Sequence, residues 1–258
     1  MPDALATGRY PGLRRILILV AVIFAIVSGY AQMAFDIGQT PSEFSADSDE
    51  TLRVAGWAFS IWGVIYLGLL IYAVWQVWPR TRETPLLERM GWPSFAAAAG
   101  IGAWIWASAA DWELATIILI VGSAVVLIAP LCSPELRASA GRERCLIGWP
   151  LGLLAGWLTI ASSVNILTVL TGNGQLPEAL SPTAWAIAAL LMVAAITVAV
   201  TWRSRLLAYP IPVVWGLIGA FGAEQARNPT LAFTAIGLAI ALAIISVVLV
   251  LRLRRAPG

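Results

Sequence analysis

The sequence of 258 residues contains no lysine and no histidine, and only 12% of its residues are charged. The absence of histidine excludes histidine-ligated haem and imidazole acid–base catalysis, and the absence of lysine excludes P-loop and Schiff-base chemistry. Soluble domains carry about one-quarter charged residues. The scarcity of charge, together with a hydrophobic content of 60%, therefore excludes a large soluble domain and indicates a membrane protein.

Cysteine and net charge are equally scarce. The 16 arginines are offset by 14 acidic residues and form only short clusters, so no nucleic-acid partner is expected. The two cysteines, Cys132 and Cys145, flank one loop. The topology predicted below places that loop in the reducing cytosol, where free thiols are expected instead of a disulfide. No metal site is predicted.

Long apolar runs recur along the chain, and a run of roughly 20 such residues crosses a bilayer core as a helix. Eight spans are predicted, at residues 16–35, 54–78, 93–110, 114–132, 146–170, 184–202, 207–225 and 230–252. We therefore predict an all-α fold, a polytopic transmembrane helical bundle of about eight spans embedded in the lipid bilayer.

Arginine is concentrated in alternate loops of this predicted bundle. Fourteen of the 16 arginines fall at the N-terminus, after spans two, four and six, or at the C-terminus, whereas only Arg53 and Arg227 fall in the opposite loops. The positive-inside rule places both termini in the cytoplasm and predicts a multi-pass protein of the cytoplasmic membrane. The opposite loops hold nine of the 14 acidic residues, Glu224 among them, and we expect these to be ordinary solvated side chains.

Tryptophan is abundant, with 13 residues. Those near predicted span ends beside arginine or proline are explained as anchors at the membrane interface. A smaller group lies deeper. Phe59, Trp62 and Tyr66 are spaced by three and four residues, which places them on one face of a helix as an aromatic stripe.

A second stripe runs from Trp157 through Ala161 to Asn165 in steps of four residues. The small Ala161 leaves a notch between a ring and an amide. An amide in apolar surroundings must bond to a neighbouring helix, a water or a ligand. On the residues alone, interhelical packing and a ligand pocket both stay open, because an apolar pocket and a membrane bundle core have the same composition.

These motifs resemble the tryptophan-rich sensory protein family, the TspO/MBR or translocator-protein group. Residues 57–66, W-A-F-S-I-W-G-V-I-Y, resemble one helix pattern of that family, especially as its longer members carry it. The W-x-x-x-A-x-x-x-N spacing from Trp157 to Asn165 matches the family's fifth helix, and Gly102 to Trp106 resembles its third. The asparagine that commonly precedes the third-helix tryptophan is absent here.

The resemblance implies three regions: a cytoplasmic N-terminal arm at 1–15, a five-helix TspO/MBR-like region at 16–170, and three additional transmembrane helices with a short basic tail at 171–258. It implies an intramembrane aromatic pocket for a planar or apolar small molecule, tetrapyrrole- or sterol-like, with sensing or translocation as output. The implied ligand-binding residues are Phe59, Trp62, Tyr66, Trp104, Trp157, Ala161 and Asn165. No cofactor is required, and a porphyrin-type ligand is compatible with the pattern.

A secondary transporter or exporter of a small apolar metabolite is the alternative function. Eight spans exceed what a minimal binding protein needs, and Pro210 with Pro212 is the best candidate for a broken helix, yet no charged residue lies deep in a span. An enzyme is not expected, because no acid–base pair or nucleophile is recognisable. The small residues Gly216, Gly219 and Ala223 predict a close helix contact, within the chain or in a homodimer.

Overall fold

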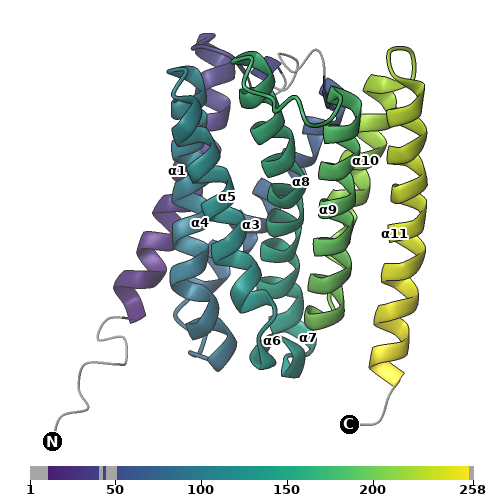
Figure 1. Ribbon diagram of the computed structural model, residues 1–258. Coiled ribbons are helices and arrows are strands. Elements are labelled where there is room, and N and C mark those ends of the chain that lie inside the picture. The colour runs from purple at the N-terminus through teal and green to yellow at the C-terminus, as the bar shows by residue number, and fades with distance from the viewer. Residues whose placement is uncertain (1–10, 41–42, 45–50, 256–258) are drawn as a thin grey trace, which may run out of the picture.

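The computed structural model describes residues 11–40, 43–44 and 51–255, and these form helices joined by short loops, with no β-strand among them. The helices are α1 (Pro11–Phe35), the 3-10 helix η1 (Gly56–Ser60), α3 (Ile61–Val77), α4 (Pro85–Ala109), α5 (Glu113–Leu131), α6 (Pro134–Ala138), α7 (Gly141–Glu143), the π-helix η2 (Arg144–Gly148), α8 (Trp149–Gly172), α9 (Pro182–Ser204), α10 (Pro210–Glu224) and α11 (Pro229–Arg255). Figure 1 shows the long helices side by side in one bundle. The predicted all-α bundle is confirmed.

Several helices begin with a proline that follows a serine or threonine. Thr84, Ser133 and Ser181 each accept a hydrogen bond from the backbone N–H three residues later, at 3.3, 3.3 and 3.2 Å. Proline suits the first helical position because its missing N–H has no partner there in any case. The positions at which these helices begin are therefore determined by adjacent residues in the sequence.

Each predicted span overlaps one long helix, but the number of membrane crossings stays a prediction. Among the described residues, six helices are long and apolar enough to cross a membrane. Helix α4 is not one of the six, and α10 has only 15 residues, about 22 Å at 1.5 Å per residue. Residues 1–10 of the predicted N-terminal arm and residues 256–258 of the predicted tail lie outside the described part, whereas residues 11–15 belong to α1.

The described arginines of the alternate loops gather at one end of the bundle, called here the arginine-rich end. Arg15 donates to the Thr81 carbonyl at 3.0 Å, and Arg205 donates to the Leu253 carbonyl at 3.1 Å. Helix α1 begins and α11 ends at this end (Figure 1). An even number of crossings is consistent with that arrangement.

Glu224 is buried, although the sequence predicts a solvated loop residue at this position. Its side chain is only 3% exposed and accepts a hydrogen bond from the backbone N–H of Arg53 at 3.0 Å. It therefore ties the end of α10 to the segment that precedes η1. The apolar pattern alone predicts a loop position for Glu224, because that pattern carries no information about long-range contacts.

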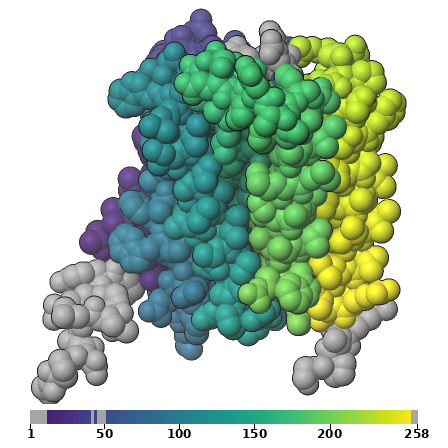
Figure 2. Space-filling model, viewed as in Figure 1, coloured from purple at the N-terminus to yellow at the C-terminus, as the bar shows by residue number. Residues whose placement is uncertain are grey.

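Helix α8 lies at the centre of the bundle and packs against α3, α5, α9 and α10. It is buried on all sides, as expected of a helix that is apolar all round. In contrast, α5, α9 and α11 form the face in view in Figure 2. Many large exposed side chains on these three helices are apolar, among them Ile118, Leu191 and Ile244, which suits contact with lipid.

Glycines permit the closest helix contacts. A Cβ at Gly156 of α8 would overlap the Tyr209 carbonyl oxygen, and one at Gly219 of α10 would lie 2.7 Å from the Cβ of Ala58. A Cβ at Gly216 would lie 2.9 Å from Ile160. The small-residue face of α10 thus serves contacts within the chain, and the homodimer stays a prediction.

Candidate functional site

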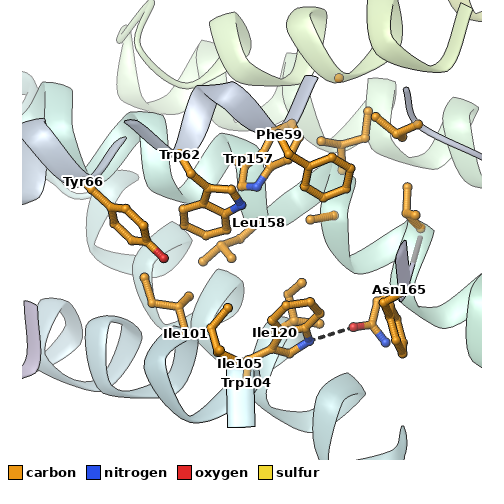
Figure 3. A pocket seen from close by; sticks show the side chains of 16 residues that line it. Phe59, Trp62, Tyr66, Ile101, Trp104, Ile105, Ile120, Trp157, Leu158 and Asn165 are labelled. Atoms are coloured by element: carbon orange, nitrogen blue, oxygen red, sulfur yellow. Dashed lines mark hydrogen bonds between the residues drawn. The ribbon is translucent and has the colours of Figure 1, made fainter. Parts of the chain in front are cut away.

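A cavity lies between the η1–α3 segment, α4, α5, α8 and α10, and we call it the aromatic cavity. Its walls include all the residues implied as ligand-binding by the sequence: Phe59, Trp62, Tyr66, Trp104, Trp157, Ala161 and Asn165. Figure 3 shows Phe59, Trp62 and Tyr66 on one side of the cavity and Trp104 with Asn165 on the other. Both stripes predicted from helical spacing therefore face the same space.

The rings on the α3 side are packed against α8 by their edges. Phe59 and Trp62 each make an edge-to-face contact with Trp157, with ring centroids 5.8 and 6.3 Å apart. Trp62 and Tyr66 lie one turn apart with centroids 5.1 Å apart. Such geometries are favourable for aromatic pairs. Trp157 is thus the point at which the two stripes meet.

Phe59 belongs to η1, one turn before α3 begins. The Trp215 indole N–H on α10 donates to the Ala58 carbonyl at 2.8 Å, and the Ala55 N–H donates to the Gly219 carbonyl at 3.0 Å. These bonds hold the 3-10 turn against α10. The position of Phe59 therefore depends on a helix far from it in sequence.

Asn165 is 2% exposed and both ends of its amide are bonded. Its Oδ1 accepts from the Trp104 indole N–H at 2.8 Å, and its Nδ2 donates to the Thr116 hydroxyl at 2.9 Å. Thr116 in turn donates to the Glu113 carbonyl at 2.6 Å. Helices α4, α5 and α8 are joined by this chain, so the amide requirement inferred from the sequence is met by neighbouring helices.

Trp104 lines the cavity with its ring and also makes a hydrogen bond to a neighbouring helix. It is 8% exposed, and Phe44, from the segment before η1, packs edge-on against it with centroids 5.9 Å apart. Its indole N–H is used by Asn165. The face of the ring is what remains available to a guest.

The aromatic cavity is small, with a volume of about 50 Å³. Beside it lies a groove of about 350 Å³, called here the α1–α3 groove, whose walls include Tyr30, Met33 and Gly63. Phe59, Trp62, Tyr66 and Ile105 line both spaces. These four side chains form the partition between the cavity and the groove.

Sequence reasoning missed several members of the cavity wall. Phe44, Ile120 and Gly216 line it and come from three other segments of the chain. The one sequence feature that could have indicated Phe44 is that it is the only phenylalanine in a largely polar loop. Gly216 was noticed as a small residue for helix packing, and its position shows that the last third of the chain also contributes to this wall.

Among the described residues that line the cavity there is no carboxylate, arginine or cysteine, and Tyr66 is the one titratable residue of this set. Among the described residues, no group of three or more acidic, cysteine or histidine side chains is placed to hold a metal ion. The arrangement provides ring faces, aliphatic surface and one amide. Such a surface is suited to binding a flat or apolar molecule.

Comparison with curated proteins and with solved structures found no match. The family described as TSPO-like protein matches residues 15–248. The match extends past Asn165, where the recognisable motifs end, through α9 and α10 and into α11. Since it covers most of the sequence, the chain belongs to the TSPO-like protein family and, with its membrane-length apolar helices, is a multi-pass membrane protein.

Proposed function

We propose that this protein binds a planar or apolar small molecule, tetrapyrrole- or sterol-like, in the aromatic cavity, and that it acts in the cytoplasmic membrane. The observation that carries the proposal is the convergence of the aromatic stripe of η1 and α3 with the Trp157–Asn165 stripe of α8 on one space whose described wall residues carry no charge. Broad ring faces bind flat molecules at a low conformational cost, because indole and phenol side chains have few rotatable bonds.

The aromatic cavity is too small for a ligand of this size, so the partition between the cavity and the groove must move when the ligand binds. A space of about 50 Å³ is far below the roughly 300–1,000 Å³ of sites for drug-sized ligands. The cavity and the α1–α3 groove together provide about 400 Å³, from 50 and 350 Å³. Rotation of Trp62 and its neighbours would join them into a space of the required size.

The α1–α3 groove also has polar side chains that could contact the polar edge of a ligand. Gln32, Thr40 and Ser60 line it, whereas the aromatic cavity offers ring and aliphatic surface with a single amide. A ligand with an apolar body and a polar rim would place the body on Trp157 and the rim toward the groove. Molecules of that description include tetrapyrroles and sterols.

Titration of detergent-solubilised protein with a porphyrin, followed by the absorbance of the porphyrin itself, tests the proposal. Trp157→Ala and Trp62→Ala are expected to weaken binding about tenfold or more, because each removes a ring face and its edge contacts. Trp112→Ala is the matched control, since Trp112 is 67% exposed and lies outside the cavity wall. Unchanged affinity in both cavity variants would contradict the proposed site.

Sensing and translocation differ in what happens after binding. The α1–α3 groove leads from the cavity to the outside of the helix pair, which favours exchange of ligand with the bilayer. Proteoliposomes loaded with porphyrin distinguish the two outputs: protein-dependent flux that is lost in Trp157→Ala supports translocation. Binding without flux supports a sensor.

A further inference from the structure

A second cavity, of about 490 Å³, lies at the arginine-rich end, between the α3–α4 loop and α7. We call it the basic pocket. Its walls include Arg80, Arg82 and Arg142, and Glu143 is the single acid among its described wall residues. Two segments of the chain that are 60 residues apart in sequence thus bring three guanidinium groups around one hollow, with a net charge of +2 from these side chains.

In the part of the chain that the structure describes, these three arginine side chains have no ion-pair partner. Each is exposed, and none makes a hydrogen bond or ion pair with another described residue. The nearby Glu83 is engaged elsewhere, because Arg14 and Arg15 both pair with its carboxylate. Thr84, the N-cap of α4, also lines the pocket, so the positive end of a 25-residue helix adds to the field.

The loop that carries Arg80 and Arg82 has a fixed conformation. The Thr81 hydroxyl donates to the Trp75 carbonyl at 2.7 Å, and the Thr81 N–H donates to the Trp78 carbonyl at 2.9 Å. Arg15 donates to the Thr81 carbonyl at 3.0 Å. A pocket whose backbone is already held in place loses less conformational entropy when a ligand binds.

An apolar surface leads directly from the membrane-spanning part of α3 into this pocket. Leu67, Ile71 and Val74 are spaced by four and three residues and lie on one face of α3, and Trp78, the residue that follows the end of the helix, comes four residues after Val74. The exposed fractions of these four side chains are 59, 46, 43 and 53%. Trp78 belongs to both the stripe and the pocket wall. Tryptophan favours the headgroup level of a bilayer.

We propose that the basic pocket binds the phosphate headgroup of an anionic phospholipid, with an acyl chain lying along the exposed face of α3. Guanidinium groups recognise phosphate through charge and paired hydrogen bonds. Basic pockets between transmembrane helices are suited to anionic headgroups. The continuous apolar stripe below the arginines favours a lipid over a soluble phosphate, because a soluble phosphate has no acyl chain to contact the stripe.

Native mass spectrometry of the full-length protein tests this, with phosphatidylglycerol and phosphatidylcholine titrated separately. Wild type is expected to retain phosphatidylglycerol in preference to phosphatidylcholine. The triple variant Arg80→Gln, Arg82→Gln, Arg142→Gln is expected to bind phosphatidylglycerol about tenfold or more weakly, because the direct charge-assisted hydrogen bonds from the guanidinium groups to the phosphate are lost. The matched control is Arg89→Gln, Arg137→Gln, Arg252→Gln, which removes the same charge outside the pocket wall.

Equal loss in the control triple would show that only net charge matters and would overturn the proposal. Equal retention of the two lipids by wild type would do the same. Full displacement of the lipid by glycerol 3-phosphate at equal concentration would assign the pocket to a soluble anion instead. Porphyrin titration of the pocket triple checks its folding, since unchanged porphyrin affinity is expected while phosphatidylglycerol is lost.

Discussion

The indole N–H of Trp104 on α4 donates to the amide oxygen of Asn165 on α8 at 2.8 Å. This bond closes one side of the aromatic cavity, and the other end of the amide continues to Thr116 on α5. Asn165 therefore positions three helices around the cavity. Its contribution to ligand affinity is expected to come largely through the placement of Trp104.

Breaking this bond should destabilise the protein. Asn165→Ala leaves the Trp104 N–H and the Thr116 hydroxyl without their partner, which costs about 1–3 kcal/mol. A double-mutant cycle with Trp104→Phe, measured by unfolding in mixed micelles, should give a coupling energy of about 1 kcal/mol. The control cycle pairs Asn165→Ala with Trp106→Phe, because Trp106 bonds to Ser28 instead. Equal coupling in the two cycles would contradict the assignment.

The contact between α8 and α10 should not tolerate a methyl group at Gly156. An added Cβ would overlap the backbone carbonyl of Tyr209, which cannot rotate away as a side chain can. Gly156→Ala is therefore expected to lower stability by about 1–3 kcal/mol. Gly122→Ala on α5 is the control, since nothing lies within 4 Å of its added Cβ, and it should be neutral or stabilising by up to about 1 kcal/mol. Thermal unfolding in detergent measures both.

Glu83 should be required to hold the start of α1 against the α3–α4 loop. Its carboxylate pairs with both Arg14 and Arg15, whose side chains are 8 and 14% exposed. Glu83→Gln leaves two largely buried cations unpaired, and a loss of about 1–2 kcal/mol is expected because the acid itself is one-third exposed. Glu88→Gln, an exposed acid in the first turn of α4, should change stability by less than about 0.5 kcal/mol. Similar losses in both variants, measured by thermal unfolding, would contradict the role of Glu83.

Binding of an uncharged ligand should be independent of pH. The described residues of the aromatic cavity wall include no carboxylate, arginine or cysteine, and burial favours the neutral form of a phenol. The dissociation constant of an uncharged sterol-like molecule should therefore vary by less than about threefold between pH 5.5 and 8.5. A larger change in a competition titration would point to a titratable group in the site.

Much of the fold follows from short-range patterns. The apolar runs predict the long helices, and the serine–proline and threonine–proline pairs mark where several of them begin. The spacings from Phe59 to Tyr66 and from Trp157 to Asn165 place side chains on common helix faces because helical periodicity is local. Hydropathy predicted the span at 207–225 that contains α10, but it did not predict the burial of Glu224, since that depends on Arg53, a residue distant in sequence.

The sequence by itself determined a helical membrane bundle and which aromatic residues share a helix face, because composition and periodicity act within a few turns. Only the tertiary structure decided that the two faces meet at Trp157, that Phe44 and Gly216 complete the wall, and that the volume of the cavity is about 50 Å³. It likewise brought Arg80, Arg82 and Arg142 around one hollow. These features arise from packing between segments far apart in the chain, where the distance between side chains depends on how helices cross and is not encoded by the spacing of residues within one helix.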